Sequence, residues 1–430
     1  MSPTAEAADA ASAARSELLG ERLIATRRRS LEIAEPLSPE DMTVQAMDDA
    51  SPTKWHLAHV TWFFETFLLV PFLDGYERFD PSYGYCFNSY YESVGARHPR
   101  PLRGLLTRPS CGEVMAYRAH VDEGLGQLLD GPRAGEPEIV RLVELGINHE
   151  QQHQELMLTD ILALFAASPI APAYLPTEDD TPSIAPAPPR WLAIDGGKLR
   201  VGHDGHGFAW DNEGPAHDVL IGPFRVADRL VTNAEWLEFM ADGGYREPLL
   251  WLADGWGAVQ REGWEAPGYW RRIDGAWHQT TLHGRAPVEP AAPVAHVSYF
   301  EADAFARWAG ARLPTEHEWE AAVARLGVRS GERGATRLAP SPCAARLDHR
   351  LHQAFGDVWQ WTQSAYLPYP GYRPPKGAIG EYNGKFMVSQ HVLRGSSAIT
   401  AAGHARVTYR NFFYPHQRWQ MAGVRLAEAP

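Results

Sequence analysis

Apolar residues recur along the first part of the chain with the period of amphipathic helices. Their spacing of three to four residues predicts helices over residues 14–33, 52–70, 110–129 and 137–165. Ser51 is a suitable N-cap for the second helix, and Pro52 suits its first position. Residues 76–101, rich in tyrosine and proline, predict a loop, and loops of this length are uncommon unless they are functional. Four helices with one long connection predict a bundle.

The pattern changes after the fourth helix. Residues 169–190 are rich in proline and alanine and predict an extended linker. From Trp191 onward, segments are short and glycine interrupts them often. Helical periodicity returns only over residues 232–241, 298–309 and 316–324. We therefore predict a helical domain over residues 1–168, the linker, and an α+β domain over residues 191–430, whose tryptophans supply part of its core.

Composition and charge narrow the functional classes. The formal charge of -13 and the lack of a basic block argue against a nucleic-acid partner. The three cysteines are odd in number and widely spaced, which favours a reducing compartment without a disulfide framework. No run approaches the roughly 18 apolar residues of a membrane span, and the N-terminus lacks the apolar core of a signal peptide. We expect a cytoplasmic protein without membrane partners.

The fourth predicted helix carries candidate metal ligands. Residues 146–158 contain no proline, and His149 and His153 lie four positions apart on a face that also carries leucines. Two imidazoles that point into a protein interior are costly unless a partner satisfies them. A bound metal ion is the simplest partner for both.

Three interpretations of this pair are open. The first is a pair of hydrogen-bonded core histidines. The second is the zinc metalloprotease signature H-E-x-x-H, with Glu150 as general base, although the proline-rich sequence downstream is poor ground for a further ligand. The third is a three-histidine site completed from upstream, by His59 in the aromatic stripe of the second helix or by its rival His56. Three neutral imidazoles suit Fe(II), Zn(II) or Cu and leave coordination positions open.

Motifs in both halves resemble known families. The first half, with His-Glu-Gln-Gln-His at 149–153, resembles a DinB-like four-helix bundle. The second half resembles the formylglycine-generating-enzyme-like domain, a C-type-lectin-related α+β fold. Its motifs are Arg-Leu-Pro-Thr-Glu-His-Glu-Trp-Glu at 312–320, Phe-Gly-Asp-Val-Trp-Gln-Trp-Thr at 355–362, Leu-Arg-Gly-Ser-Ser at 393–397 and Gly-Val-Arg-Leu at 423–426. In this order, the two domains resemble the ergothioneine-biosynthetic sulfoxide synthases.

This resemblance implies a reaction and a set of metal ligands. In that family, a mononuclear non-haem Fe(II) uses O2 to join a thiol to the imidazole C2 of hercynine (Nα-trimethylhistidine), and the product is a sulfoxide. The resemblance implies that His59, His149 and His153 bind the iron. It also implies that Gln152, within the same motif, forms a hydrogen bond to the hercynine imidazole.

The resemblance also implies where the trimethylammonium group of hercynine binds. Asn411 and Phe412 match the segment that receives this group. A quaternary cation donates no hydrogen bond, but a carbonyl and aromatic faces can hold it. By its pattern alone, this segment predicts a strand of the core.

The thiol substrate separates the branches of this family. Residues 87–101 resemble the branch that uses free cysteine, whereas the mycobacterial-type branch uses γ-glutamylcysteine and lacks the tyrosine pair. The resemblance implies that Tyr90 and Tyr91 lie near the iron and that one of them donates a proton or an electron to the oxygen intermediate. Arg97 or Arg100 could bind the cysteine carboxylate in a bidentate manner.

Other functions remain as alternatives. Formylglycine-generating enzymes use C-terminal cysteines, but residues 394–397 contain none, so we expect the second domain to serve as a substrate wall. The same reaction with γ-glutamylcysteine is one alternative. An ovothiol-type synthase, which joins cysteine to histidine, is another, although those enzymes usually carry a fused methyltransferase, which this sequence does not predict. Outside this class stand a zinc-dependent DinB-like thiol transferase or hydrolase and a non-catalytic binding module.

Overall fold

The computed structural model describes residues 3–176, 187–328, 337–343 and 350–430. The chain divides into two compact units, Met1–Ala167 with Gly377–Ile379, and Ser168–Lys376 with Gly380–Pro430. The predicted linker over residues 169–190 lies partly outside the described residues. The predicted fold class is confirmed, because a helical domain precedes a domain of short strands and helices.

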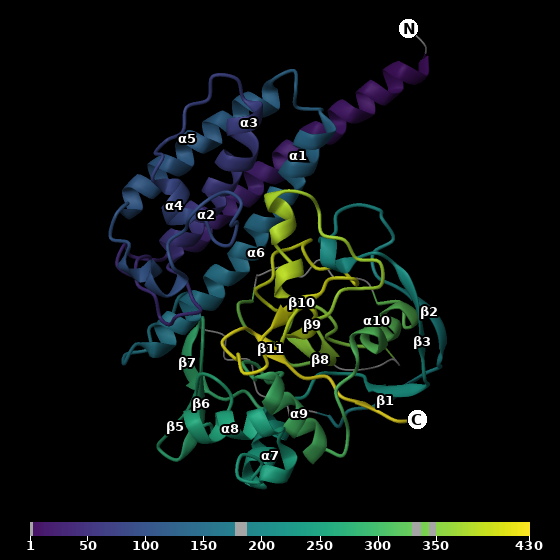
Figure 1. Cartoon of the computed structure of the whole chain (residues 1–430). Coiled ribbons are helices and arrows are strands. Elements are labelled where there is room, and N and C mark those ends of the chain that lie inside the picture. Colours follow the sequence, from purple (N-terminus) through teal and green to yellow (C-terminus); the bar gives the residue numbers. More distant parts are fainter. Residues whose placement is uncertain (1–2, 177–186, 329–336, 344–349) are drawn as a thin grey trace. The chain divides into compact units, whose positions relative to one another are not determined.

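The first unit is built on four principal helices, α1, α2, α5 and α6 (Figure 1). Its segments are α1 (Pro3–Ala34), α2 (Thr53–Phe64), the π-helical turn η1 (Glu65–Leu69), α3 (Val70–Phe72), α4 (Tyr83–Phe87), the 3₁₀ turn η2 (Arg100–Leu105), α5 (Cys111–Asp130) and α6 (Pro137–Ala167). All four predicted helices are present, and the second continues through η1 and α3. The predicted loop contains α4 and η2. Within the described residues, no helix is long and apolar enough to cross a membrane.

The two helices that carry the candidate ligands, α2 and α6, pack closely against each other. Every residue of α2 is buried. Gly146 on α6 permits the approach, because a Cβ at this position would lie 2.6 Å from Cζ of the Phe64 ring. A glycine inside a helix costs about 0.5–1 kcal/mol relative to alanine, so its presence here reflects the packing. His149, three residues further along α6, consequently faces His59 of α2.

The second unit contains small sheets in its described residues (Figure 1). The strands are β1 (Trp191–Ile194), β2 (Gly197–Val201), β3 (His217–Ile221), β4 (Phe224–Ala227), β5 (Trp270–Ile273), β6 (Ala276–Thr281), β7 (Gly284–Pro287), β8 (Trp359–Ala365), β9 (His391–Gly395), β10 (Asn411–Phe413), β11 (Ala422–Gly423) and β12 (Ala427–Glu428). Their orders are β1-β4-β12, β10-β9-β8-β11, β2-β3 and β5-β6-β7. Paired strands are antiparallel, except that β11 runs parallel to β8.

Most helices of the second unit begin with a capping box. The helices described in this unit are α7 (Asn233–Ala241), α8 (Ala253–Glu262), α9 (Tyr299–Trp308) and α10 (Glu316–Arg325). Thr232, Ser298 and Thr315 cap α7, α9 and α10, and each accepts from the N–H of a glutamate three residues later. These three helices were predicted. The periodicity does not predict α8, which contains Gly255 where a Cβ would lie 2.8 Å from Cβ of Phe300.

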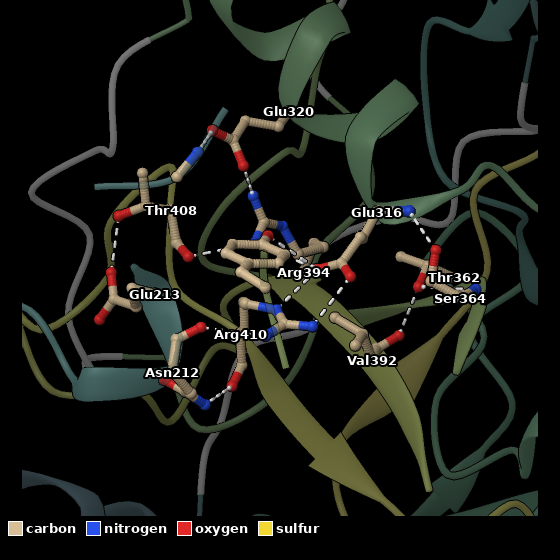
Figure 2. A network of polar contacts seen from close by, with 12 residues as sticks. Asn212, Glu213, Glu316, Glu320, Thr362, Ser364, Val392, Arg394, Thr408 and Arg410 are labelled. Atoms are coloured by element: carbon tan, nitrogen blue, oxygen red, sulfur yellow. Dashed lines mark hydrogen bonds and ion pairs between the residues drawn. The ribbon is translucent and has the colours of Figure 1, made fainter. Parts of the chain in front are cut away.

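A buried network of ion pairs connects α10 to the sheet that contains β9 and β10 (Figure 2). Glu316 on α10 accepts two hydrogen bonds from Arg410, at 2.8 and 2.9 Å. Glu320, one turn further along α10, pairs with Arg394 on β9. All four side chains are buried. Because a buried charge is costly without its partner, these pairs fix the start of β10, over residues 411–413.

Candidate metal centre

Three histidines from two helices meet inside the first unit. His59 lies on α2, and His149 and His153 lie one turn apart on α6. One ring nitrogen of each lies within 4.8 Å of the other two, and Nε2 of His59 is 3.3 Å from Nε2 of His149. All three side chains are buried. Within the described part of the chain, they form the one cluster of three side chains that could hold a metal ion.

The protein engages the outward nitrogens of two of these rings. Nδ1–H of His59 donates to the carbonyl of Phe87, 2.6 Å away. Nδ1 of His153 lies 2.8 Å from Nδ1 of His56, whose Nε2 lies 3.0 Å from Oδ2 of Asp160. A neutral imidazole carries a single N–H. The bond to Phe87 therefore leaves a lone pair on Nε2 of His59, the nitrogen that faces the cluster.

Aromatic rings hold the two facing imidazoles in place. Trp55 stacks on His59 at 4.7 Å between ring centroids and an interplanar angle of 10°. Trp62 stacks on the same ring at 5.7 Å and 19°. Phe63 packs against His149 at 4.6 Å. Close packing of this kind restricts rotation of the rings, so the nitrogens keep their directions without a ligand.

Burial favours the neutral form of all three imidazoles. It lowers the pKa of His149 to about 3. It also lowers the pKa of His59 and of His153 well below the usual value, and neighbouring imidazoles lower both further. The neutral imidazole is the form that binds metal ions. Three neutral nitrogen donors with no thiolate fit Fe(II), Zn(II) or Cu, so the residues present suit the Fe(II) that the family resemblance implies.

Glu150 does not have the surroundings of a general base. Its carboxylate accepts from Ser30 at 2.7 Å, pairs with Arg27 at 3.2 Å, and pairs with Arg118. Burial by itself raises the pKa of Glu150, but the two arginines and the hydroxyl outweigh burial and hold the pKa at about 2. A carboxylate with three partners and such a low pKa is a poor proton acceptor near neutral pH. The metalloprotease interpretation of the H-E-x-x-H stretch therefore loses its base.

The predicted tyrosine pair lies in a segment attached to the cluster. Asn88 directly follows Phe87, whose carbonyl accepts the hydrogen bond from His59. Its Nδ2 donates to the carbonyl of Tyr91 at 3.0 Å, and its Oδ1 accepts from the N–H of Tyr91 at 3.2 Å. The buried Tyr91 ring lies 5.8 Å from Trp62, which stacks on His59, and Tyr90 lies 4.8 Å from Tyr91. Trp62 thus packs against both Tyr91 and His59, which links the tyrosine pair to the histidine cluster.

The other predicted residues of the first unit have different surroundings. Gln152 is half-buried on α6, beside His153. Arg97 is half-buried and pairs with the exposed Glu92. Arg100 is exposed at the start of η2. The assignment of either arginine to the thiol substrate stays a prediction.

The predicted hercynine-binding residues of the second unit lie on β10. Phe412 stacks on Tyr366 at 4.1 Å and 10°, and Phe386 lies 6.2 Å from Phe412. Oδ1 of Asn411 accepts from the N–H of Phe412 at 2.9 Å. Stacked aromatic rings beside an amide carbonyl are suited to a quaternary ammonium group.

Residues around the histidines were missed by sequence reasoning. Asp160 accepts the N–H of Ser51 at 2.8 Å in addition to its contact with His56. Arg103 donates to the Ser51 hydroxyl at 2.8 Å, and its guanidinium carbon lies over the Trp55 ring, 3.3 Å from the ring centroid. Asp160 had a signal, since it interrupts an apolar run two turns after His153, on nearly the same helix face. Arg103 had none, because its partners are distant in sequence.

Known proteins match both units. Residues 22–157 match the DinB superfamily, and residues 179–336 and 328–430 match the sulfatase-modifying factor enzyme 1-like domain. The hercynine oxygenases of Mycolicibacterium smegmatis and Mycobacterium tuberculosis are each 33% identical to this chain, over 96% of it and 98% of their own length. Formylglycine-generating enzyme of Streptomyces coelicolor is 30% identical, over 55% of this chain and 86% of its own.

Structural similarity is lower. PvdO from Pseudomonas aeruginosa covers 56% of this chain and 94% of its own, with a TM-score of 0.37 and 18% identity, which supports no inference about function. The hercynine oxygenases, in contrast, match along nearly the whole sequence, through the helical unit with the histidine cluster and through the α+β unit. Because this similarity extends over both domains, the chain belongs to the hercynine oxygenase family.

Proposed function

We propose that this chain is a sulfoxide synthase that joins the thiol of cysteine to the imidazole C2 of hercynine, a step of ergothioneine biosynthesis. The S–H and C–H bonds break, a C–S bond forms, one oxygen atom of O2 goes to sulfur, and the other leaves as water. O2 takes two electrons from C–S bond formation and two from sulfur, so no further reductant is needed. The supporting observation is a buried three-histidine cluster in a chain that is similar to hercynine oxygenases over its length.

In this proposal, His59, His149 and His153 hold Fe(II), which would supply the redox chemistry of O2. The protein's contribution is to keep the three imidazoles neutral and correctly directed. Burial favours the neutral form, and the stacked indoles hold the ring of His59. Three protein ligands leave coordination positions for substrate and O2.

The family resemblance suggests one set of residues for the imidazole of hercynine and another for its trimethylammonium group. The side-chain amide of Gln152, adjacent to His153, would hydrogen-bond the imidazole ring, which places C2 near the metal. The aromatic cluster around Phe412 and the carbonyl of Asn411 would receive the trimethylammonium group. The ring faces carry partial negative charge and need no hydrogen bond from the ligand.

Free cysteine is the proposed thiol because residues 87–101 resemble the cysteine-using branch. Tyr90 and Tyr91 would act near the metal, one of them as a proton or electron donor, since a phenol can donate a proton and hydrogen-bond to oxygen. Arg97 or Arg100 would bind the cysteine carboxylate. Arg97 would then exchange its present partner Glu92 for the substrate, whereas Arg100 is exposed at the start of η2.

Two alternatives within this reaction type remain testable. Similarity to mycobacterial hercynine oxygenases favours γ-glutamylcysteine as the thiol, because the mycobacterial-type branch uses that peptide. An ovothiol-type synthase would use histidine in place of hercynine. γ-Glutamylcysteine is larger than cysteine by a γ-glutamyl group, and hercynine is larger than histidine by three methyl groups. The masses of the products therefore show which substrates were used.

The test is a product assay with a matched set of substrates. Anaerobically purified protein loaded with Fe(II) is mixed with O2, with either hercynine or histidine, and with either cysteine or γ-glutamylcysteine, and the products are identified by mass spectrometry. We expect hercynyl-cysteine sulfoxide as the main product, with equimolar consumption of O2.

The other outcomes separate the alternatives. A product from γ-glutamylcysteine alone would keep the reaction and overturn the choice of thiol. A product from histidine alone would favour an ovothiol-type synthase. No product from iron-loaded protein with any pair would overturn the proposal and favour a zinc-dependent transferase or a binding module.

A further inference from the structure

A hydrogen-bonded chain extends from the candidate metal ligand His153 into the protein. His56 lies on α2, three residues before His59, and its two ring nitrogens contact different partners. Its Nδ1 is 2.8 Å from Nδ1 of His153, and its Nε2 is 3.0 Å from Oδ2 of Asp160. All three side chains are buried, with at most 8% of each residue exposed. Both ring nitrogens of His56 are thus engaged by protein side chains, which favours His59 over His56 as the predicted third ligand.

The positions of the protons in this chain follow from Asp160. An ionised carboxylate accepts hydrogen bonds and donates none. Oδ2 of Asp160 therefore accepts from Nε2–H of His56. A neutral His56 then has a lone pair at Nδ1, so the 2.8 Å contact requires Nδ1–H of His153 to donate to it. His153 is left with a lone pair on Nε2.

We propose that Asp160 and His56 are positioning residues that lock His153 in the tautomer whose Nε2 binds the metal. This inference rests on the metal site of the proposed function. A metal-bound histidine commonly donates its other N–H to a carboxylate, a carbonyl or water, which fixes the tautomer and the ring orientation. Here a second histidine is interposed, so one carboxylate on α6 sets the protons of two imidazoles.

The surrounding residues hold this chain in a single arrangement. Asp160 also accepts the backbone N–H of Ser51 at 2.8 Å, which ties the carboxylate to the start of α2. Arg103 donates to the hydroxyl of Ser51 at 2.8 Å. His59 is held in the same tautomer by a different partner, because its Nδ1–H donates a hydrogen bond to the carbonyl of Phe87. Both ligands thus present Nε2 to the cluster before any metal binds.

The tautomer can be tested in metal-free protein, without any assay of activity. Protein labelled with ¹⁵N-histidine is examined by NMR at neutral pH, and the His153→Phe variant identifies the signals of that ring. We expect a protonated Nδ1 and an unprotonated Nε2 for His153. A proton on Nε2 of His153 would overturn the inference directly.

Metal affinity tests whether the lock matters for binding. Co(II) serves as a probe that has an absorbance spectrum, and it is titrated anaerobically into wild-type protein and variants. His56→Phe fills the space but removes the acceptor, and we expect about a 10- to 100-fold loss of Co(II) affinity with a changed absorbance band. His56→Asn is smaller but keeps an acceptor two bonds from Cβ, where Nδ1 of histidine lies. We expect it to recover most of the affinity.

The order of these two variants distinguishes positioning from packing. A role in packing alone would make the larger phenylalanine the better substitute, and the losses would follow thermal stability. His120→Phe is the matched control, since this half-buried histidine on α5 contacts the carbonyl of Glu77 and should leave Co(II) affinity unchanged. Unchanged affinity in His56→Phe would overturn this inference alone. Failure of the wild-type protein to bind Co(II) would overturn the metal site and the inference with it.

Discussion

Each candidate ligand imidazole has two nitrogens, one that faces the cluster and one that faces away from it. The H-E-x-x-H spacing predicts that His149 and His153 share a helix face, and it predicts no more than that. The atoms that hold the outer nitrogens come from elsewhere: the carbonyl that holds His59 lies 28 residues away, and His56 lies 97 residues from His153. The partners of Glu150 could not be predicted from the neighbouring sequence either, since Arg27 lies 123 residues before it. Sequence can therefore suggest ligands, while tautomers depend on long-range contacts.

The assignment of His59 and His56 leads to the first prediction. His59→Ala removes one of three ligands, so we expect its Fe(II) affinity to fall by more than the roughly 100-fold that loss of an outer partner costs. His56→Ala keeps all three ligands and is expected to bind one equivalent of Fe(II), more weakly than the wild-type protein. Anaerobic titration followed by metal analysis measures both. Equal iron content in the two variants would show that the third ligand is wrongly assigned.

The second prediction concerns the approach of α2 and α6. Gly146→Ala places a methyl group against the Phe64 ring, so the ring or a helix must move. We expect a loss of about 1–3 kcal/mol in the free energy of unfolding, the usual cost of overpacking. Because both helices carry candidate ligands, Co(II) affinity should fall as well. Urea unfolding monitored by circular dichroism and a Co(II) titration measure the two effects.

The control for this variant is another helical glycine in the same unit. Gly126 lies on α5, and a Cβ there would meet nothing within 4 Å. Gly126→Ala should therefore stabilise the protein by about 0.5–1 kcal/mol through helix propensity, with unchanged metal affinity. Equal behaviour of the two variants would show that the close approach at Gly146 has no energetic importance.

The third prediction uses the buried pair of Glu316 on α10 and Arg410, the residue before β10. Burial by itself raises the pKa of Glu316, but Arg410 and Arg394 outweigh it and hold the pKa below the usual value. Glu316→Gln leaves buried arginine charge unpaired, so we expect a loss of about 3–5 kcal/mol at neutral pH. Urea unfolding followed by fluorescence measures this loss, since most of the 15 tryptophans lie in the second unit.

The pH dependence of this stability follows from the direction of the shift. A carboxyl group with a lowered folded-state pKa stabilises the fold above its unfolded pKa, near 4.3, and this contribution is lost as pH falls through the folded value. The wild-type curve should therefore descend below about pH 4.3 more steeply than that of Glu316→Gln. Glu262→Gln, in an exposed pair with Arg261, should follow the wild-type curve. Parallel curves for wild type and Glu316→Gln would contradict the argument.

The helices show which local signals suffice for prediction. The capping boxes at Thr232, Ser298 and Thr315 are complete within four residues, so α7, α9 and α10 could be predicted from sequence. In contrast, α8 contains glycines whose purpose appears only when Gly255 meets Phe300 on α9. The strands were predicted only as a class, because they are short and their partners are far apart in sequence.

The two units contribute different parts of the proposed function. The candidate metal ligands lie together in the helical unit, and the aromatic cluster around Phe412 lies in the α+β unit. Similarity to hercynine oxygenases covers 96% of the chain, whereas similarity to a formylglycine-generating enzyme covers 55%. This difference in coverage fits a family that combines a helical unit with a domain that also occurs in other proteins. Metal binding and recognition of the trimethylammonium group should then be separable by mutation.

The fourth prediction tests that separation. Phe412→Leu keeps an apolar side chain but removes the ring face, so a quaternary cation should lose about 0.5–2 kcal/mol of binding. We expect the KM for hercynine to rise about 2- to 30-fold, while Co(II) affinity stays at the wild-type value. Phe413→Leu is the control, because adjacent strand residues face opposite sides and Phe413 packs against Trp419 instead. If Phe412→Leu weakened Co(II) binding, or if both variants raised the KM equally, the assignment of the trimethylammonium group to Phe412 would have to be abandoned.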